Sequence, residues 1–146
     1  MLAKDIMTTS VVTVGAFESL ATAARLMLNH RINALPVLDE HGRLVGMIGI
    51  RDVLRVPVPS YSDSPIIKWA RLEEKAALLN ETSVRAVMNR RVVTVDETAT
   101  VIEVAALMAN RGVHPIPVMR DGQLLGVVGR ADVARALLAL AQSLGD

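Results

Sequence analysis

An internal repeat limits the folds open to this chain more than any other feature of its sequence. When residues 1–56 are aligned with residues 83–146, identical residues recur in the same order. The offset is 81 positions as far as Pro36 and Pro117, and it falls to 80 after the next loop, which is one residue shorter in the second copy. Beyond this loop, both copies keep a Gly-x-x-Gly-x-x-Asp run in register. The chain therefore consists of two copies of one unit, 1–56 and 83–146, joined by a linker at 57–82.

Each copy is predicted to contain the elements β-α-β-β-α. Short runs of β-branched residues predict a first strand at Val11–Val14 and at Val92–Val95. Apolar residues at helical spacing predict a helix over Glu18–Asn29 and over Thr100–Asn110. Two strands joined by a glycine turn, and then a final helix, complete each copy. We expect these elements at Leu35–Leu38, at Leu44–Ile48 and from Arg51 onward, and at Ile116–Met119, at Leu124–Val128 and from Arg130 to about Ala141.

The linker is predicted to hold a helix of its own. The segment Val56–Ser60 alternates valine with proline, which favours extended backbone. Ser64 and Pro65 then have the residue types preferred at an N-cap and at the first helical position, and the helix is expected to reach about Leu79. Its Trp69 is the expected anchor against the rest of the chain or against a second subunit.

The composition argues against several classes of function. Without cysteine, the chain has neither a disulfide framework nor a thiol nucleophile. One Phe, one Tyr and one Trp are too few for the stacking platform of a single-strand binder, and a net charge of +1 creates no field that attracts nucleic acid or an anionic membrane. The most apolar stretch, Ala134–Leu144, is too short to span a bilayer, and no signal peptide is recognised. The sequence therefore predicts a folded cytoplasmic protein without membrane or nucleic-acid partners, and the basic stretch at 85–91 is interpreted as a solvated face.

No residue pattern in the sequence points to catalysis. His30, His41 and His114 lack the spacing of metal ligands, and no glycine-rich phosphate loop occurs. The sequence also offers no recognisable acid–base or nucleophile constellation. We therefore expect no enzymatic activity, no metal site and no required cofactor.

The order of these elements resembles the tandem CBS domains that together form a Bateman module. Each copy carries Met, Val-Val-Thr-Val, a helix with Leu-Met near its end, a Leu/Ile-Pro-Val strand and the Gly-to-Asp run, and these motifs cover nearly the whole chain. The resemblance implies an α/β fold in which two pseudo-symmetric β-α-β-β-α repeats pack sheet to sheet, with the linker helix inserted. The chain is similar to stand-alone bacterial CBS pairs, which carry no catalytic domain. The implied function is regulatory: binding of AMP, ADP, ATP or S-adenosylmethionine in clefts between the copies, homodimerisation, and control of a partner protein.

The resemblance also implies a binding motif, Gly-h-h-Thr/Ser-x-x-Asp, where the last strand meets the last helix. Its Asp corresponds to Asp52 and Asp132, and in the family this carboxylate accepts hydrogen bonds from the ribose hydroxyls. Capping of the helix N-terminus is the alternative role. The Thr/Ser hydroxyl, which helps to hold a phosphate, is lost because Gly49 and Gly129 stand at its position. The loss removes about 1 kcal/mol of hydrogen bonding, while glycine allows a close backbone approach or a positive φ.

Further candidates flank these two motifs. Arg51 and Arg130 lie beside the aspartates and are either phosphate ligands or solvated side chains. His114 and Asn33 align at a second phosphate contact of the family, and the backbone near Thr13 and Thr94 is expected to read the adenine edge. The complete set of predicted ligand-binding residues is Val12, Thr13, Asn33, Gly49, Arg51 and Asp52 in the first copy, and Val93, Thr94, His114, Pro115, Gly129, Arg130 and Asp132 in the second.

The two copies are not expected to bind equally. The second copy is favoured as the anion site because it has His114, Arg130 and the neighbouring Arg90-Arg91 pair. The loss of the hydroxyl from both copies leaves another function open, that of a ligand-free CBS pair serving as a dimerising scaffold for a separate protein.

Overall fold

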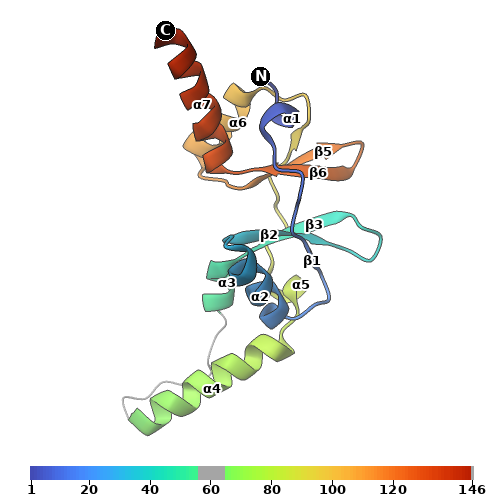
Figure 1. The fold of residues 1–146 in the computed structure, drawn as a ribbon. Helices are drawn as coiled ribbons and strands as arrows, with labels where there is room; N and C mark the ends of the chain where they lie inside the picture. The colour runs from blue at the N-terminus through green and yellow to red at the C-terminus, as the bar shows by residue number, and fades with distance from the viewer. Residues whose placement is uncertain (56–64, 146) are drawn as a thin grey trace. The chain divides into compact units, whose positions relative to one another are not determined.

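Two three-stranded sheets form the framework of the protein (Figure 1). The computed structural model describes residues 1–55 and 65–145, with side chains from residue 72 onward in the second range. The strands of the first sheet are β1 (Val14–Gly15), β2 (Ala34–Leu38) and β3 (Leu44–Gly49). Those of the second are β4 (Val95–Asp96), β5 (Ile116–Arg120) and β6 (Gln123–Val128). In each sheet the first strand is parallel to the second, and the second is antiparallel to the third.

The helices follow the predicted order in both copies. The first copy has α2 (Leu20–His30) and α3 (Ile50–Leu54), and the second has α6 (Val101–Arg111) and α7 (Arg130–Gly145). Figure 1 shows that α2 and α3 lie on one face of the first sheet, and that α6 and α7 lie on one face of the second. The mixed α/β class and the duplicated β-α-β-β-α order are thereby confirmed.

Local signals explain where these helices begin and end. The Thr100 side chain accepts a hydrogen bond from the Glu103 N–H, and the Glu103 carboxylate accepts one from the Thr100 N–H. Gly112 ends α6 in the left-handed conformation, with φ 65°. The first strands are shorter than predicted, because the ladder pairs only Val14 with Val37 and Gly15 with Leu38 before the chain turns toward α2.

The linker helix is present as α4 (Pro65–Glu81), two residues longer than expected. The predicted cap at Ser64 and the predicted anchor Trp69 lie outside the residues and side chains that the structure describes. Leu78 and Leu79, near the end of α4, pack against the core of the first copy. The described part of α4 therefore belongs with this copy.

The chain divides into two compact units whose limits differ from those of the sequence repeats. The β1–β3 unit is Val12–Val92, and the β4–β6 unit combines Met1–Val11 with Val93–Asp146. Each copy thus sends its first residues into the unit that holds the other copy's sheet. The repeat boundaries at 56 and 83 describe the duplicated sequence and stay a prediction, whereas these units describe how the chain packs.

Two short helices that the sequence analysis did not predict begin the exchanged segments. The first is α1 (Ala3–Ile6), and after it the Thr8 N–H donates to the Val127 carbonyl while the Val127 N–H donates to Thr8. The second is α5 (Val84–Val87), after which Asn89 and Met47 exchange the same two bonds. Both exchanged segments are therefore held by paired backbone hydrogen bonds to the third strand of a sheet.

Glycines in these strands allow the exchanged segments to approach closely. A Cβ placed on Gly126 would lie 2.7 Å from the Thr8 carbonyl oxygen and 2.8 Å from the Met7 sulfur. A Cβ on Gly46 would lie 2.6 Å from the Met88 sulfur and 3.0 Å from the Asn89 carbonyl oxygen. These spaces are too small for a side chain, so both positions require glycine while the segments stay in place.

Each unit has its own aliphatic core. Burial of apolar surface contributes about 25 cal/mol per Å², and within the described residues every core position is apolar. In the β1–β3 unit, the largest fully buried side chains are Leu20, Met27, Leu35 and Ile48; in the β4–β6 unit they are Val104, Ile116, Val118 and Val128. The two sheets are thus positioned by separate cores, and each core supports one junction between a strand and a helix.

Candidate functional site

The two aspartates of the Gly-to-Asp runs lie at matching junctions. We call the turn from β3 into α3 the α3 junction, and the turn from β6 into α7 the α7 junction. Gly49 donates its backbone N–H to Asp52 Oδ2 over 2.7 Å, and Gly129 donates its N–H to Asp132 Oδ2 over 2.8 Å. Both carboxylates therefore cap the first turn of a helix, where a negative charge is also favoured by the helix dipole. The capping role is confirmed, and it leaves the second oxygen of each carboxylate for other donors.

The glycines at these junctions are not required by the backbone. Gly49 has φ −122°, an extended conformation open to any residue, so it does not use the positive φ that glycine allows. A Cβ on Gly49 would lie 3.4 Å from the Asn33 carbonyl oxygen, and one on Gly129 would lie 3.6 Å from Asp132 Oδ2. Both are ordinary contacts, so each position has room for a Cβ atom.

The α3 and α7 junctions differ in how their first helical amide is used. At the α3 junction, the Ile50 N–H donates to the Asn33 carbonyl over 2.9 Å. At the α7 junction, no backbone carbonyl of the described residues accepts from the Arg130 N–H. The strand pairing is also one residue shorter here: Ala34 of β2 pairs with Gly49, whereas β5 begins at Ile116, and the aligned Pro115 has no strand partner among the described residues. The Arg130 N–H at the α7 junction therefore has no backbone acceptor among the described residues, whereas the corresponding N–H at the α3 junction, that of Ile50, is already hydrogen-bonded.

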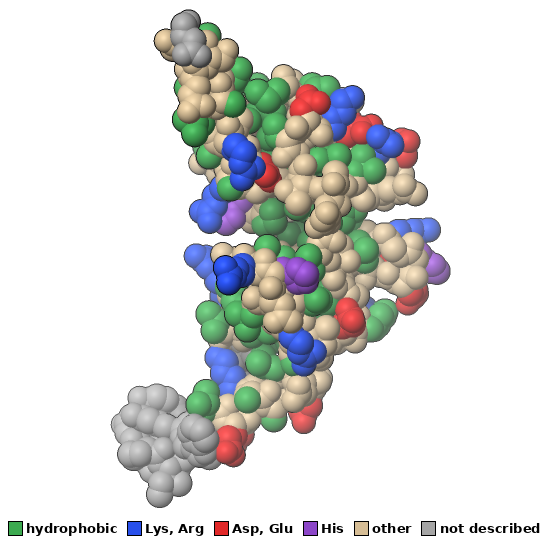
Figure 2. All heavy atoms as spheres, in the orientation of Figure 1, with side chains coloured by type: hydrophobic (Ala, Val, Ile, Leu, Met, Phe, Trp, Pro, Cys, Tyr) green, Lys and Arg blue, Asp and Glu red, His purple; other side chains and the backbone are tan. Residues whose placement is uncertain are grey.

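The basic side chains near the junctions are open to solvent. Arg51, Arg130 and His114 are exposed, as is Asn33. Figure 2 shows Lys, Arg and His side chains gathered over the start of α7. Arg135, one turn along α7, has its Nη1 3.2 Å from Asp132 Oδ1. The sequence analysis missed this ion pair, although the i, i+3 spacing of Asp and Arg on a predicted helix is a signal that favours it.

The remaining candidates lie in the same unit as the aspartate of their copy. Val12 and Thr13 directly precede β1, and Val93 and Thr94 directly precede β4, outside any helix or strand. Val12 packs partly against the core of the β1–β3 unit, whereas Thr94 is exposed. The boundaries between the two compact units fall between residues 11 and 12 and between residues 92 and 93. The predicted ligand-binding residues of each copy therefore lie in one unit.

The Arg90-Arg91 pair and Asp132 belong to different compact units. Arg90 and Arg91 belong to the β1–β3 unit and not to the unit of Asp132. Arg90 Nη2 donates to the Arg85 carbonyl, and the Arg91 N–H donates to Asn89 Oδ1. The preference for the α7 junction then rests on His114, on Arg130 and on the unused Arg130 amide.

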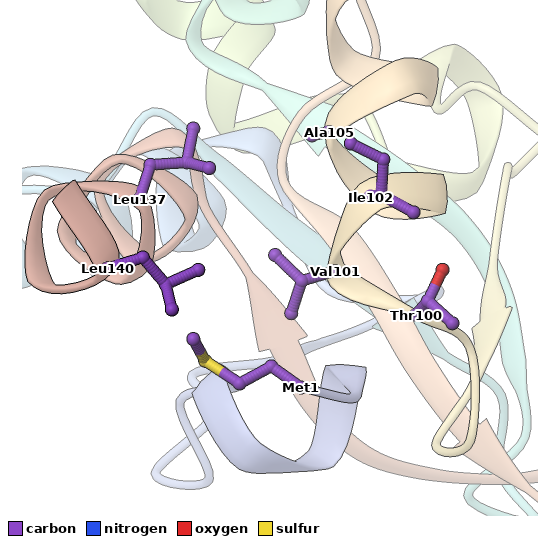
Figure 3. Close-up of a pocket in the computed structure, with 7 residues that line it drawn as sticks. All are labelled: Met1, Thr100, Val101, Ile102, Ala105, Leu137 and Leu140. Carbon is purple, nitrogen blue, oxygen red and sulfur yellow. The ribbon is translucent and has the colours of Figure 1, made fainter. Parts of the chain in front are cut away.

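An apolar groove lies in the β4–β6 unit, away from the Gly-to-Asp run. It has a volume of about 380 Å³ and lies between α6 and α7 (Figure 3). Its lining is almost entirely aliphatic: Met1, Thr100, Val101, Ile102, Ala105, Leu137 and Leu140. Leu138 and Leu144 on α7 are also exposed. The groove offers apolar contact but no charged side chain.

Two negative findings apply to the described residues. Among residues 1–55 and 65–145, no three His, Cys, Asp or Glu side chains come together as a metal site would require. In the same part of the chain, no helix combines the length and the apolar character needed to cross a membrane.

Relatives at the level of sequence span nearly the whole chain. Hypoxic response protein 1 of Mycobacterium tuberculosis is 33% identical over 137 residues, which are 92% of this chain and 84% of that protein. The L-aspartate semialdehyde sulfurtransferase of Methanocaldococcus jannaschii is 30% identical over 135 residues. This match covers 92% of this chain but only 23% of the enzyme.

Solved structures with bound ligands resemble the fold. CBSX2 in complex with AMP superposes with a TM-score of 0.76 at 26% identity, covering 94% of this chain and 97% of that one. The CBS domain pair of protein MJ0100, in complex with 5′-methylthioadenosine and S-adenosyl-L-methionine, gives a TM-score of 0.69 at 28% identity over 95% and 97%. Hypoxic Response Protein I was solved with two coordinated zinc ions and has a TM-score of 0.70 at 32% identity, covering 92% of this chain and 98% of that one.

The family model of the CBS domain matches the chain twice, at residues 3–58 and 84–139. Together the two matches span most of the sequence, and each includes one Gly-to-Asp run. CBS pairs of known structure bind AMP, S-adenosylmethionine or 5′-methylthioadenosine. The duplicated sequence, the two three-stranded sheets and these matches lead to one conclusion: the chain belongs to the CBS domain family.

Proposed function

We propose that this protein is a non-enzymatic regulatory module that binds an adenosyl ligand such as AMP, ADP, ATP or S-adenosylmethionine. Binding at the α3 and α7 junctions would change the conformation of the pair and so signal to a partner protein in the cytoplasm. The observation that carries the proposal is the pair of capping aspartates, Asp52 and Asp132, each of which directs one oxygen to its own helix and turns the other away from the cap, where in Asp132 it meets the exposed Arg135. A carboxylate that only accepts hydrogen bonds suits the two hydroxyls of a ribose.

The α7 junction is the better candidate for a ligand that carries phosphate. The unused Arg130 N–H begins a helix of 16 residues, so both an amide donor and a helix dipole favour an anion there. The exposed Arg130 and His114 side chains add donors on the same side. At the α3 junction the corresponding amide is bound to the Asn33 carbonyl. Phosphate recognition is accordingly assigned to Gly129, Arg130 and His114, and ribose recognition to Asp132.

A ligand screen tests the proposal directly. Thermal unfolding of the chain is measured with AMP, ADP, ATP, S-adenosylmethionine and NADH, each at millimolar concentration. A ligand present at one hundred times its dissociation constant stabilises the folded state by about 2.7 kcal/mol. If no adenosyl compound raises the unfolding temperature, the proposal of an adenosyl sensor is wrong.

Restoring the missing hydroxyl is expected to strengthen AMP binding at the α7 junction. Gly129→Thr adds a hydroxyl beside the start of α7, at a position where the structure accommodates a Cβ without a close contact. One added hydrogen bond of about 1 kcal/mol corresponds to roughly a 5-fold lower dissociation constant. Fold stability should hardly change, because Gly and Thr are similar N-caps.

Isothermal titration calorimetry with AMP measures this effect, and Gly129→Val is the matched control. Valine has nearly the shape of threonine but no hydroxyl. A gain of equal size in the valine variant would trace the effect to shape and contradict the hydrogen-bond explanation.

The apolar groove favours a second candidate function, that of a dimerising scaffold. Exposed leucines on α7 beside the groove offer surface for a second copy of the chain. A homodimer is part of both candidate functions, whereas only the scaffold dispenses with the ligand. Light scattering of the chain with and without Leu137→Asp measures the dimer. If the unaltered chain is a dimer and no ligand of the screen binds, the scaffold function is favoured.

A further inference from the structure

The carboxylate of Asp132 is more fully occupied than that of Asp52. At the α7 junction, Asp132 Oδ2 accepts from the Gly129 N–H over 2.8 Å, and Oδ1 lies 3.2 Å from Arg135 Nη1. At the α3 junction, Asp52 Oδ2 accepts from the Gly49 N–H, but no ion pair joins Asp52 to Arg55, which aligns with Arg135. Asp52 and Arg55 of the first copy can therefore be compared directly with Asp132 and Arg135 of the second.

The helices that follow the two aspartates differ in length. α7 continues to Gly145, so Arg135 lies within the helix and one turn from Asp132, where i and i+3 side chains meet. α3 ends at Leu54, and Arg55 is already its C-cap. The Asp132 side chain is only 14% exposed while that of Arg135 is 72% exposed. Arg135 thus covers the outward oxygen of a largely buried carboxylate and remains free to move away from it.

A ribose at the α7 junction would need that same oxygen. The Asp132 oxygen that does not cap the helix is the natural acceptor for ribose hydroxyls, and Arg135 competes with them for it. An uncharged adenosyl ligand that displaces Arg135 leaves the guanidinium without its carboxylate partner. A ligand that carries phosphate offers the displaced guanidinium a new anion, to which Arg binds well.

We propose that Arg135 is a specificity-determining residue at the α7 junction, which disfavours uncharged adenosyl ligands and spares phosphorylated ones. The inference rests on the proposed function, because it assigns a selectivity to that same site. Exposed ion pairs of this kind are weak, so the expected effect on affinity is about 2- to 5-fold. The α3 junction has no such pair and should not make this distinction.

The experiment compares adenosine with AMP in a chain whose α3 junction has been weakened. Asp52→Asn removes the charge there, while the asparagine side-chain oxygen can still accept the capping bond from Gly49. In this background, Arg135→Gln should tighten adenosine binding by about 2- to 5-fold and leave AMP binding unchanged or weaker, as measured by calorimetry. The matched control is Arg55→Gln in an Asp132→Asn background. There the ratio of the affinities for adenosine and AMP should not change.

The outcomes separate this inference from the function on which it rests. If the unaltered chain binds no adenosyl compound, the proposed function is wrong and the selectivity is wrong with it. If it binds another adenosyl compound but neither adenosine nor AMP, only the selectivity is overturned. If the chain binds AMP but Arg135→Gln leaves the ratio of the two affinities unchanged, only the selectivity is overturned. A purely structural role of Arg135 would alter the affinities for both ligands in the same direction, which would also overturn it.

Discussion

Replacing Asp132 with asparagine is expected to weaken AMP binding at the α7 junction by about 10- to 100-fold. Hydrogen bonds to a charged acceptor are worth about 1.5–3 kcal/mol each, against about 0.5–1.5 kcal/mol for a neutral one, and a ribose would make two of them. Asparagine can still accept the Gly129 N–H, so the helix cap is preserved and the loss falls on ligand recognition. Calorimetric titration with AMP measures the change.

Asp52→Asn is the matched control for this prediction. It makes the same chemical change at the α3 junction, where the first helical amide already donates to the Asn33 carbonyl. We expect the smaller loss there. Equal losses in the two variants, or a larger loss at Asp52, would overturn the preference for the α7 junction. Unfolding curves of both variants should overlay that of the unaltered chain, since both caps remain.

Gly126→Ala is expected to destabilise the fold by about 1–3 kcal/mol, the usual cost of forcing extra volume into a packed site. The added methyl would meet the Thr8 carbonyl oxygen at 2.7 Å, and a backbone atom cannot yield as the end of a side chain can. The exchanged segment must move away, which breaks the two bonds between Thr8 and Val127. For a chain of this size, 1 kcal/mol corresponds to about 2–4 °C in the unfolding temperature, so thermal unfolding measures the effect.

Alanine substitutions at two further glycines provide comparisons for the loss of stability in Gly126→Ala. Gly46→Ala meets the flexible Met88 side chain first and should cost less than Gly126→Ala. Gly145→Ala, with nothing within 4 Å of the added carbon, should be neutral or slightly stabilising. If the unfolding temperatures of Gly126→Ala and Gly145→Ala agree, the first segment does not pack against β6 as described.

Much of the fold follows from local patterns in the sequence. Apolar spacing located α2 and α6, and the Thr100–Glu103 capping box and Gly112 marked the ends of α6. These signals work because helix formation and termination depend on side chains within a few residues of one another. The aspartate at each junction was likewise identified from a motif within one turn, and the structure places it at the start of the expected helix.

The two junctions proved less alike than their sequences. The Asn33 carbonyl accepts from the Ile50 N–H, whereas no backbone carbonyl of the described residues accepts from the Arg130 N–H, although the two junctions align in the sequence. Arg90 and Arg91 are a similar case, since they belong to the second copy in the sequence but to the β1–β3 unit in the structure. Differences of this kind arise from backbone pairing between distant segments, for which a local motif carries no signal.

The sequence by itself determined the duplication, the order of strands and helices in each copy, and the positions of Asp52 and Asp132. Each of these depends on short-range spacing or on direct comparison of the two copies. Only the tertiary structure decided that Met1–Val11 joins the sheet of the second copy and that Asp132 pairs with Arg135 while, among the described residues, Asp52 has no matching pair with Arg55. The physical reason is the same in both cases. Which backbone groups and side chains meet depends on how segments pack and where a helix ends, so the two copies differ in their available donors and acceptors.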